Sequence, residues 1–292
     1  MTMFSILILS AIQGVTELLP VSSSAHVIVA ARLMGFDPAS PSMTFFLVML
    51  HTGTMFAVIV FFWKAWKDTL FFSRTSLRES LKLIFAATFF TSLVAVVLKY
   101  LVEKFFFKNV LHAEVENLFG NLGLISVALA AVGFLILAAG WIRLRTPQEK
   151  ASLGAISACV IGAVQGICLP FRGFSRSGAT ISTGLLLGIS QKKAEEFSFA
   201  LAVILTPPII IREVWRLLKA EQSAMFSRTD MFHLFFPGLL GMAMSFVFGL
   251  LALQWLSNWL ERGRWSWFGI YCLCAAAGVY FLNVYDNKIP LV

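Results

Sequence analysis

The most informative segment of the chain for its fold is Gln13-Gly14-Val15-Thr16-Glu17-Leu18-Leu19-Pro20-Val21-Ser22-Ser23-Ser24-Ala25-His26. It interrupts an apolar region, residues 1–34, with a proline, three consecutive serines and a carboxylate. A helix needs roughly 20 apolar residues to cross about 30 Å of hydrocarbon, and neither half of this region is that long. Non-helical backbone at membrane depth must be buried in protein or line a wet cavity. The region therefore predicts a re-entrant helix–loop–helix hairpin over residues 1–34.

The rest of the chain has the composition of a polytopic membrane protein. Of its 292 residues, 59% are hydrophobic and 13% are charged, which is about half the charged fraction of an ordinary soluble domain. The net charge of +8 lies mainly in short segments between apolar runs, which indicates membrane topology and argues against nucleic acid as a partner. We expect an all-α fold with six transmembrane helices, at about 43–63, 81–98, 122–142, 197–218, 232–256 and 265–282.

A second broken region lies at residues 151–189 and contains Leu169-Pro170-Phe171-Arg172-Gly173-Phe174-Ser175-Arg176-Ser177-Gly178. It is similar to the first region, because Gln165 and Ser175 each stand 152 residues after a residue of the same type there. Like the first, it is apolar at both ends and interrupted by Pro, Gly and Ser in the middle. The sequence therefore predicts a second re-entrant hairpin, over residues 151–189.

Each predicted hairpin precedes three spans, and three crossings reverse the side of the membrane. The chain is thus expected to form one integral membrane domain of two inverted repeats, residues 1–142 and 151–283. Corresponding broken segments in inverted halves indicate a binding site near the membrane midplane. The charged loops on one side carry 12 Lys and Arg, against nine on the other, so we expect both termini outside the cytoplasm and four cytoplasmic loops, near 64–82, 143–150, 191–196 and 257–264.

Three charged residues are predicted to lie at membrane depth: Glu17, Arg172 and Arg176. Each costs on the order of 3 kcal/mol to insert, so we expect these residues to serve a site. A Gly-, Ser- and Arg-containing loop that opens a helix is an anion cradle, because free backbone N–H groups and the positive helix end face the ligand. Arginine adds paired donors that match phosphate oxygens. Phosphate is therefore the favoured ligand.

Other side chains of these segments can supply chemistry. Ser23 or Ser175 could act as a nucleophile or as a hydrogen-bond donor. His26 or Glu17 could move a proton, and Glu17 could also hold a divalent cation. His51 lies within a predicted span, where it either lines the same cavity or is an ordinary hydrogen-bonded core histidine.

Residues 13–26 and 173–180 resemble the two signature motifs of the bacterial undecaprenyl-diphosphate phosphatases of the BacA type. The resemblance extends over most of the chain, including the spans and the stretch Glu196-Phe197-Ser198-Phe199. It implies six spans and two re-entrant hairpins in an inverted repeat, in the bacterial inner membrane. It also implies hydrolysis of undecaprenyl diphosphate to undecaprenyl phosphate and inorganic phosphate. This reaction recycles the lipid carrier of peptidoglycan and cell-wall synthesis and is connected with bacitracin resistance.

The resemblance also implies roles for particular residues. The implied catalytic residues are Glu17, Ser23, His26 and Arg176. The implied substrate-binding residues are Ser175, Ser177, Gly178 and Thr180, and we also expect Gln13 and Arg172 to bind substrate.

Two positions depart from the family pattern. Gln13 stands where many members have a glutamate, which leaves Glu17 as the single carboxylate for a divalent cation, Mg²⁺ or Ca²⁺. Arg172 stands where a proline usually precedes the glycine of the loop, and we expect its side chain to grip phosphate.

Two other functions remain open from the sequence. Inverted repeats with broken helices are a transporter architecture, so the chain could be a flippase for polyprenyl phosphate. Loss of the carboxylate at Gln13 leaves a non-catalytic lipid-phosphate binder as a further alternative. The lipid bilayer and a long-chain prenyl diphosphate are the expected partners in the leading interpretation, and a homodimer is left open.

Overall fold

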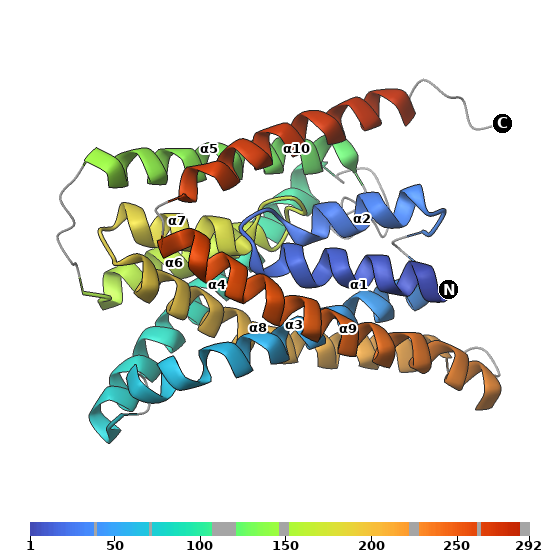
Figure 1. The fold of residues 1–292 in the computed structure, drawn as a ribbon, viewed down its shortest axis with the longest axis horizontal. Coiled ribbons are helices and arrows are strands. Elements are labelled where there is room, and N and C mark those ends of the chain that lie inside the picture. Colours follow the sequence, from blue (N-terminus) through green and yellow to red (C-terminus); the bar gives the residue numbers. More distant parts are fainter. Residues whose placement is uncertain are drawn as a thin grey trace.

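The structure is a computed structural model that describes residues 1–37, 40–69, 72–106, 121–145, 152–221, 228–261 and 264–286. This part of the chain is all-helical and contains no strand (Figure 1). Its helices are α1 (Met3–Leu18), α2 (Ser23–Leu33), α3 (Pro41–Thr69), α4 (Arg74–Phe106), α5 (Leu122–Arg145), α6 (Ala155–Cys168), α7 (Arg176–Leu186), α8 (Gln191–Glu221), α9 (Arg228–Glu261) and α10 (Trp265–Asp286).

Six of the described helices are long and apolar enough to cross a membrane: α3, α4, α5, α8, α9 and α10. This confirms the six predicted spans. The helices are longer than the apolar segments that predicted them. Parts of all four predicted loops are therefore helical: residues 64–69, 74–82, 143–145, 191–196 and 257–261. The physical reason is that a helix continues its backbone hydrogen bonds past the hydrocarbon edge, where the charged side chains of its end turns reach water.

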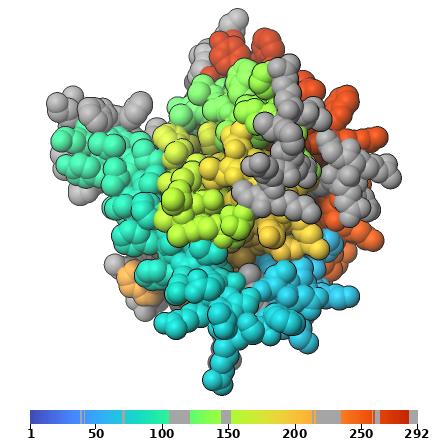
Figure 2. Space-filling view, turned by 90° about the vertical axis from the view of Figure 1, so that its left-hand side faces the viewer, coloured from blue at the N-terminus to red at the C-terminus, as the bar shows by residue number. Residues whose placement is uncertain are grey.

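The long helices pack in pairs around the shorter ones. Helix α5 lies along α10, and α3 lies along α9 (Figure 1). Helices α6 and α7 lie between α4 and α5 at the end of the molecule shown in Figure 2. The largest buried apolar cluster joins these layers and includes Leu18, Val132, Ile181, Leu201 and Trp265.

The outer faces of the bundle carry large exposed apolar side chains. On α4 these include Phe85, which is 74% exposed, and Val96, which is 67% exposed. Such a surface would be unusual on a soluble monomer. It fits helices whose outer faces contact lipid.

Both predicted breaks are present as interruptions between paired helices. Between α1 and α2, Pro20 supplies no backbone N–H, and Ser22 adopts a left-handed conformation with φ of 67°. Between α6 and α7, Gly173 has φ of 102°, and a Cβ atom there would lie 2.6 Å from the Ile125 carbonyl oxygen. Only glycine combines that backbone conformation with so close an approach. The two interruptions therefore follow from local residue types.

Two glycines allow α1 and α3 to pack closely against the same part of α9. A Cβ atom on Gly14 would lie 2.6 Å from Phe248 Cβ, and a Cβ atom on Gly53 would overlap the Met242 carbonyl oxygen and the Ser245 hydroxyl. The Ser245 hydroxyl donates to the Leu50 carbonyl oxygen at 2.9 Å. Small residues of this kind let membrane helices approach closely. This close packing brings the residues next to Gly14 in α1 near the residues next to Gly53 in α3.

Replacement of Gly53 by alanine is expected to lower the apparent Tm of the detergent-solubilised protein by several degrees, because the added methyl group must separate α3 from α9. Gly278→Ala in α10 is the matched control, since nothing lies within 4 Å of a Cβ atom there. Thermal unfolding of both variants measures the difference. Equal Tm values for the two variants would contradict the close packing at Gly53.

Candidate functional site

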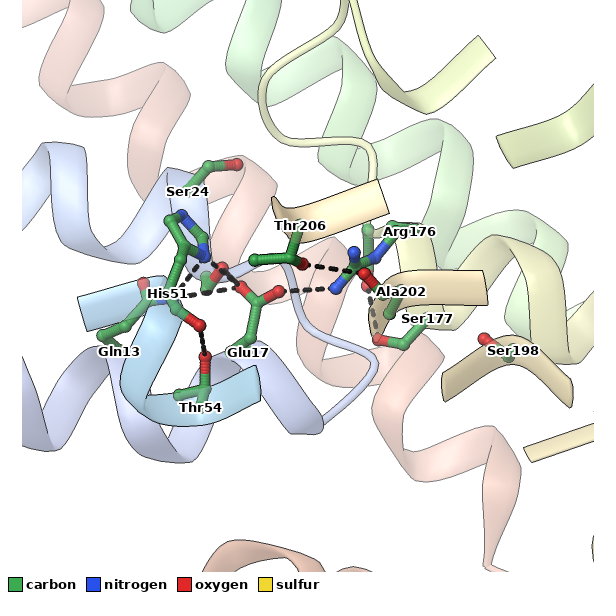
Figure 3. Close-up of polar contacts among 12 residues, drawn as sticks. Gln13, Glu17, Ser24, His51, Thr54, Arg176, Ser177, Ser198, Ala202 and Thr206 are labelled. Carbon is green, nitrogen blue, oxygen red and sulfur yellow. Dashed lines mark hydrogen bonds and ion pairs between the residues drawn. The ribbon is translucent and has the colours of Figure 1, made fainter. Parts of the chain in front are cut away.

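The two helix breaks meet at an ion pair. Glu17, in the last turn of α1, accepts a hydrogen bond at Oε1 from Arg176 Nη2 at 2.6 Å (Figure 3). Arg176 is the first residue of α7, and the Ser177 hydroxyl beside it donates to the Leu19 carbonyl oxygen at 3.3 Å. The Glu17 side chain is 13% exposed and the Arg176 side chain 25%. The predicted residues of the two motifs are thus joined across the fold.

The second oxygen of Glu17 is surrounded by polar groups from three elements. The Ser23 hydroxyl, at the start of α2, donates to Oε2. Gln13 Nε2, one helical turn before Glu17, donates to the same oxygen at 3.1 Å. His51 Nδ1, from α3, lies 3.3 Å from it. A hydroxyl that donates to a carboxylate is placed to pass its proton to that carboxylate.

The start of α7 has the form expected of an anion cradle. The Ser175 hydroxyl caps the helix by accepting from Gly178 N–H at 3.2 Å. Thr180 points elsewhere, since its hydroxyl donates to the Arg176 carbonyl oxygen at 2.8 Å and lies 2.5 Å from the Ser198 hydroxyl of α8. Ser175 and Thr180 therefore order the helix start, while the Arg176 guanidinium reaches toward α1.

A small cavity of about 10 Å³ adjoins the ion pair, with room for roughly one water molecule. Its polar lining comes from Glu17, Arg176, His51, Thr54 and Thr206. Its apolar lining comes from α1, α3 and α8, and consists of Leu18, Met55, Val58, Phe199, Ala202 and Val203. The cavity is thus lined by the charged side chains of Glu17 and Arg176, and most of its other lining residues are apolar.

The hydrogen bonds of His26 do not go to the residues around Glu17. Its Nδ1 is 2.7 Å from the Ser22 carbonyl oxygen, and its Nε2 is 2.7 Å from the Tyr271 hydroxyl of α10. Arg172 is half-buried in the loop before α7 and is not among the residues that line the cavity. The structure therefore brings together Gln13, Glu17, Ser23 and Arg176, whereas the hydrogen bonds of His26 go to Ser22 and Tyr271.

His51 is the histidine that lines the cavity. The sequence indicated it only as one of two equal interpretations, because a histidine inside an apolar span is compatible with both. Tyr271 had no sequence signal, since nothing local distinguishes it from the other aromatic residues of α10. The position of His51 at the cavity and the contact of Tyr271 with His26 both depend on which helices lie side by side.

The described residues do not form a divalent-cation site around Glu17. No group of three or more His, Cys, Asp or Glu side chains with metal-binding geometry occurs in the part of the chain that the structure describes. Both oxygens of Glu17 already accept hydrogen bonds, one of them from a guanidinium group. A cation beside Arg176 would be repelled by its charge. A divalent cation at Glu17 would therefore need ligands beyond these side chains, such as oxygens of a bound phosphate.

The fold and this site define a class: an all-helical, multi-pass membrane protein with a serine, a carboxylate and an arginine gathered where two broken helix pairs meet. The family described as "Bacitracin resistance protein BacA" matches residues 6–278. The chain belongs to this family, which confirms the resemblance found in its motifs.

Curated relatives extend over nearly the full length. The chain is 55% identical over 283 residues to "Undecaprenyl-diphosphatase 2" of Acinetobacter baylyi, covering 96% of this chain and 97% of that protein. It is 31% identical over 281 residues to "Undecaprenyl-diphosphatase" of Parabacteroides distasonis, covering 94% and 96%. It is also 32% identical over 290 residues to the protein of that name from Bacteroides fragilis, covering 97% and 98%.

Proposed function

We propose that this chain is a membrane-embedded phosphatase that hydrolyses undecaprenyl diphosphate to undecaprenyl phosphate and inorganic phosphate. One observation carries the proposal: a serine hydroxyl donates to a carboxylate that an arginine holds, at the junction of the two motifs. The near-full-length identity to an undecaprenyl-diphosphatase supports the same reaction. A flippase or a non-catalytic binder of lipid phosphate would not need a hydroxyl paired with a base.

Arg176 and the start of α7 bind the diphosphate. One guanidinium nitrogen, Nη2, holds Glu17, and the remaining N–H groups of the fork are suited to phosphate oxygens. The capped first turn of α7 adds the positive end of a helix. Ser175, Ser177, Gly178 and Thr180 order this turn, and Arg172 adds positive charge to the loop before it.

Ser23 is the nucleophile and Glu17 is its base. The Ser23 oxygen attacks the terminal phosphorus as its proton passes to Glu17, and the bond from phosphorus to the bridging oxygen breaks. The leaving undecaprenyl phosphate receives the proton from Glu17. A water molecule then attacks the phosphoserine, gives a proton through Glu17 to the serine oxygen, and inorganic phosphate leaves. These steps use the side chains of Ser23 and Glu17 and one water molecule.

His26 orders the backbone that carries Ser23. Its Nδ1 faces a carbonyl oxygen, which can only accept, so Nδ1 carries a proton and donates to Ser22. The contact supports the left-handed conformation of Ser22, the residue immediately before the nucleophile. His26 thereby acts on the reaction through the position of Ser23.

Helices α1–α2 and α6–α7 are re-entrant hairpins of two inverted repeats, residues 1–142 and 151–283, in the bacterial inner membrane. With 16 and 14 residues, α1 and α6 reach about 24 and 21 Å, short of the hydrocarbon thickness. Both termini lie on the periplasmic side, and a homodimer is compatible with this arrangement. Labelling of single cysteines from each side of sealed vesicles tests the topology; labels entering the two ends of α1 from opposite sides would contradict a hairpin.

The reaction is tested with purified protein in detergent and undecaprenyl diphosphate. We expect release of one phosphate for each undecaprenyl phosphate formed, and no release from undecaprenyl phosphate itself. Absence of release, together with lipid translocation in vesicles, would establish the flippase instead. A parallel assay with a chelator tests the cation expected from the sequence: loss of release would mean that a cation enters despite the hydrogen bonds on both Glu17 oxygens.

A further inference from the structure

The amide of Gln13 lies between Glu17 and His51. Gln13 Nε2 is 3.1 Å from Glu17 Oε2 and 2.8 Å from His51 Nδ1 (Figure 3). An amide nitrogen carries two hydrogens, so it can donate to the carboxylate and to the imidazole at the same time. The reverse orientation would place the amide oxygen against a carboxylate oxygen, which is repulsive. Gln13 therefore donates to both neighbours.

This contact determines which nitrogen of His51 carries hydrogen. Two donors would face each other at 2.8 Å if Nδ1 were protonated, so Nδ1 accepts from Gln13. The 3.3 Å approach of Nδ1 to Glu17 is then a contact between two acceptors and not an ion pair; it is longer than both contacts of the amide nitrogen, at 3.1 and 2.8 Å. A neutral imidazole that accepts at Nδ1 must carry its proton on Nε2. His51 is consequently an Nε2–H donor.

The Nε2–H group is available to a ligand. Within the described residues, His51 Nε2 has no hydrogen-bond partner, whereas Nδ1 is occupied. The His51 side chain is 35% exposed and lines the cavity together with Glu17 and Arg176. A neutral N–H donor near a guanidinium suits an oxygen-rich anion and does not suit a cation.

We propose that His51 is a further substrate-binding residue, whose Nε2–H donates to a phosphate oxygen of the diphosphate, and that Gln13 is the positioning residue that sets this tautomer. The proposal rests on the proposed phosphatase function. It gives a purpose to the glutamine at position 13, where many family members have glutamate. A carboxylate at position 13 can only accept, so it would favour the His51 tautomer with the proton on Nδ1. Nε2 would then face the phosphate oxygens with a lone pair and could not donate to them.

The matched variants form a double-mutant cycle of Gln13→Glu and His51→Gln. Gln13→Glu alone is expected to lower kcat/KM by about 10- to 100-fold, the usual effect of losing one hydrogen bond to a charged group. His51→Phe, which keeps a planar ring without the donor, is expected to lose a similar amount. His51→Gln is expected to lower kcat/KM by less than His51→Phe does. Adding Gln13→Glu to His51→Gln is expected to lower kcat/KM by less than a further threefold, because the amide at position 51 can rotate to donate to, or accept from, either neighbour.

A second measurement reads the tautomer directly and does not depend on activity. In protein labelled with ¹⁵N at histidine, the signal assigned by its loss in His51→Gln is expected to show a protonated Nε2 and an unprotonated Nδ1. Gln13→Glu is expected to move the proton to Nδ1. A wild-type signal with protonated Nδ1 would overturn the proposal. It would also be overturned if the loss of kcat/KM in the double variant equalled the product of the losses in Gln13→Glu and His51→Gln. Failure of the phosphatase function instead would appear as absent phosphate release with the predicted tautomer intact.

Discussion

Replacement of Ser23 by alanine is expected to lower kcat/KM for undecaprenyl diphosphate by at least about 10³-fold, because it removes the attacking oxygen. The hydroxyl of Ser23 donates to Glu17, which makes it the hydroxyl of the site that is already aligned with a base. The effect on stability should be small by comparison, since Glu17 keeps its hydrogen bonds from Gln13 and Arg176. Loss of activity with little change in Tm is the expected pattern.

Ser24→Ala is the matched control for this prediction. Ser24 is the next residue, yet its hydroxyl lies 3.4 Å from the Ser22 hydroxyl and makes no hydrogen bond to Glu17. Its removal is expected to change kcat/KM by no more than a few-fold. Rapid quenching of the wild-type protein with labelled substrate should trap phosphate on Ser23. Full activity in Ser23→Ala, or label on another residue, would contradict its role as nucleophile.

Replacement of Arg176 by alanine is expected to have two separate effects. It should lower kcat/KM by about 10³-fold or more, because the guanidinium binds the transferring phosphoryl group. It should also destabilise the fold by about 3–5 kcal/mol, since it leaves the Glu17 carboxylate, only 13% exposed, without its cation. The 2.6 Å hydrogen bond that is lost joins residues at the ends of α1 and α7.

The two effects can be separated with further variants. Glu17→Gln combined with Arg176→Ala is expected to recover most of the lost Tm, because no buried charge remains, but none of the activity. Arg176→Lys is expected to keep much of the stability and still lose about 10²-fold in kcat/KM, since a lysine supplies charge without the paired donors. Thermal unfolding and phosphate release are measured on the same preparations. Recovery of activity together with stability would mean that Arg176 is only structural.

The hydropathy of the chain was sufficient for the membrane helices. Six long apolar runs predicted six spans, and the structure contains them, because the cost of burying polar groups in lipid acts on each segment separately. The helix ends next to the predicted cytoplasmic loops, in α3, α4, α5, α8 and α9, were predicted less well. Their end turns are charged, and charge alone does not stop a helix.

The two motifs also predicted much of the site. Glu17, Ser23 and Arg176 were chosen because charge and clustered serines are expensive or unusual at membrane depth. The structure joins these three residues by direct hydrogen bonds. The first motif indicated His26, whose Nε2 lies against the Tyr271 hydroxyl, whereas His51, which lines the cavity, lies outside both motifs. A ring can turn to either side of its helix, and the residue pattern does not say which neighbour it meets.

Hydropathy and residue type therefore predict where the chain crosses the membrane, where its helices break, and which side chains are too costly at membrane depth to lack a function. Which of those side chains meet depends on how the helices pack. Glu17 is hydrogen-bonded to Arg176, which lies 159 residues further along the chain. His51 contacts Gln13 because Gly14 and Gly53 pack against the same part of α9. The physical reason is that hydropathy and helix breaking are properties of each segment, whereas a hydrogen bond between helices depends on how closely their backbones can approach.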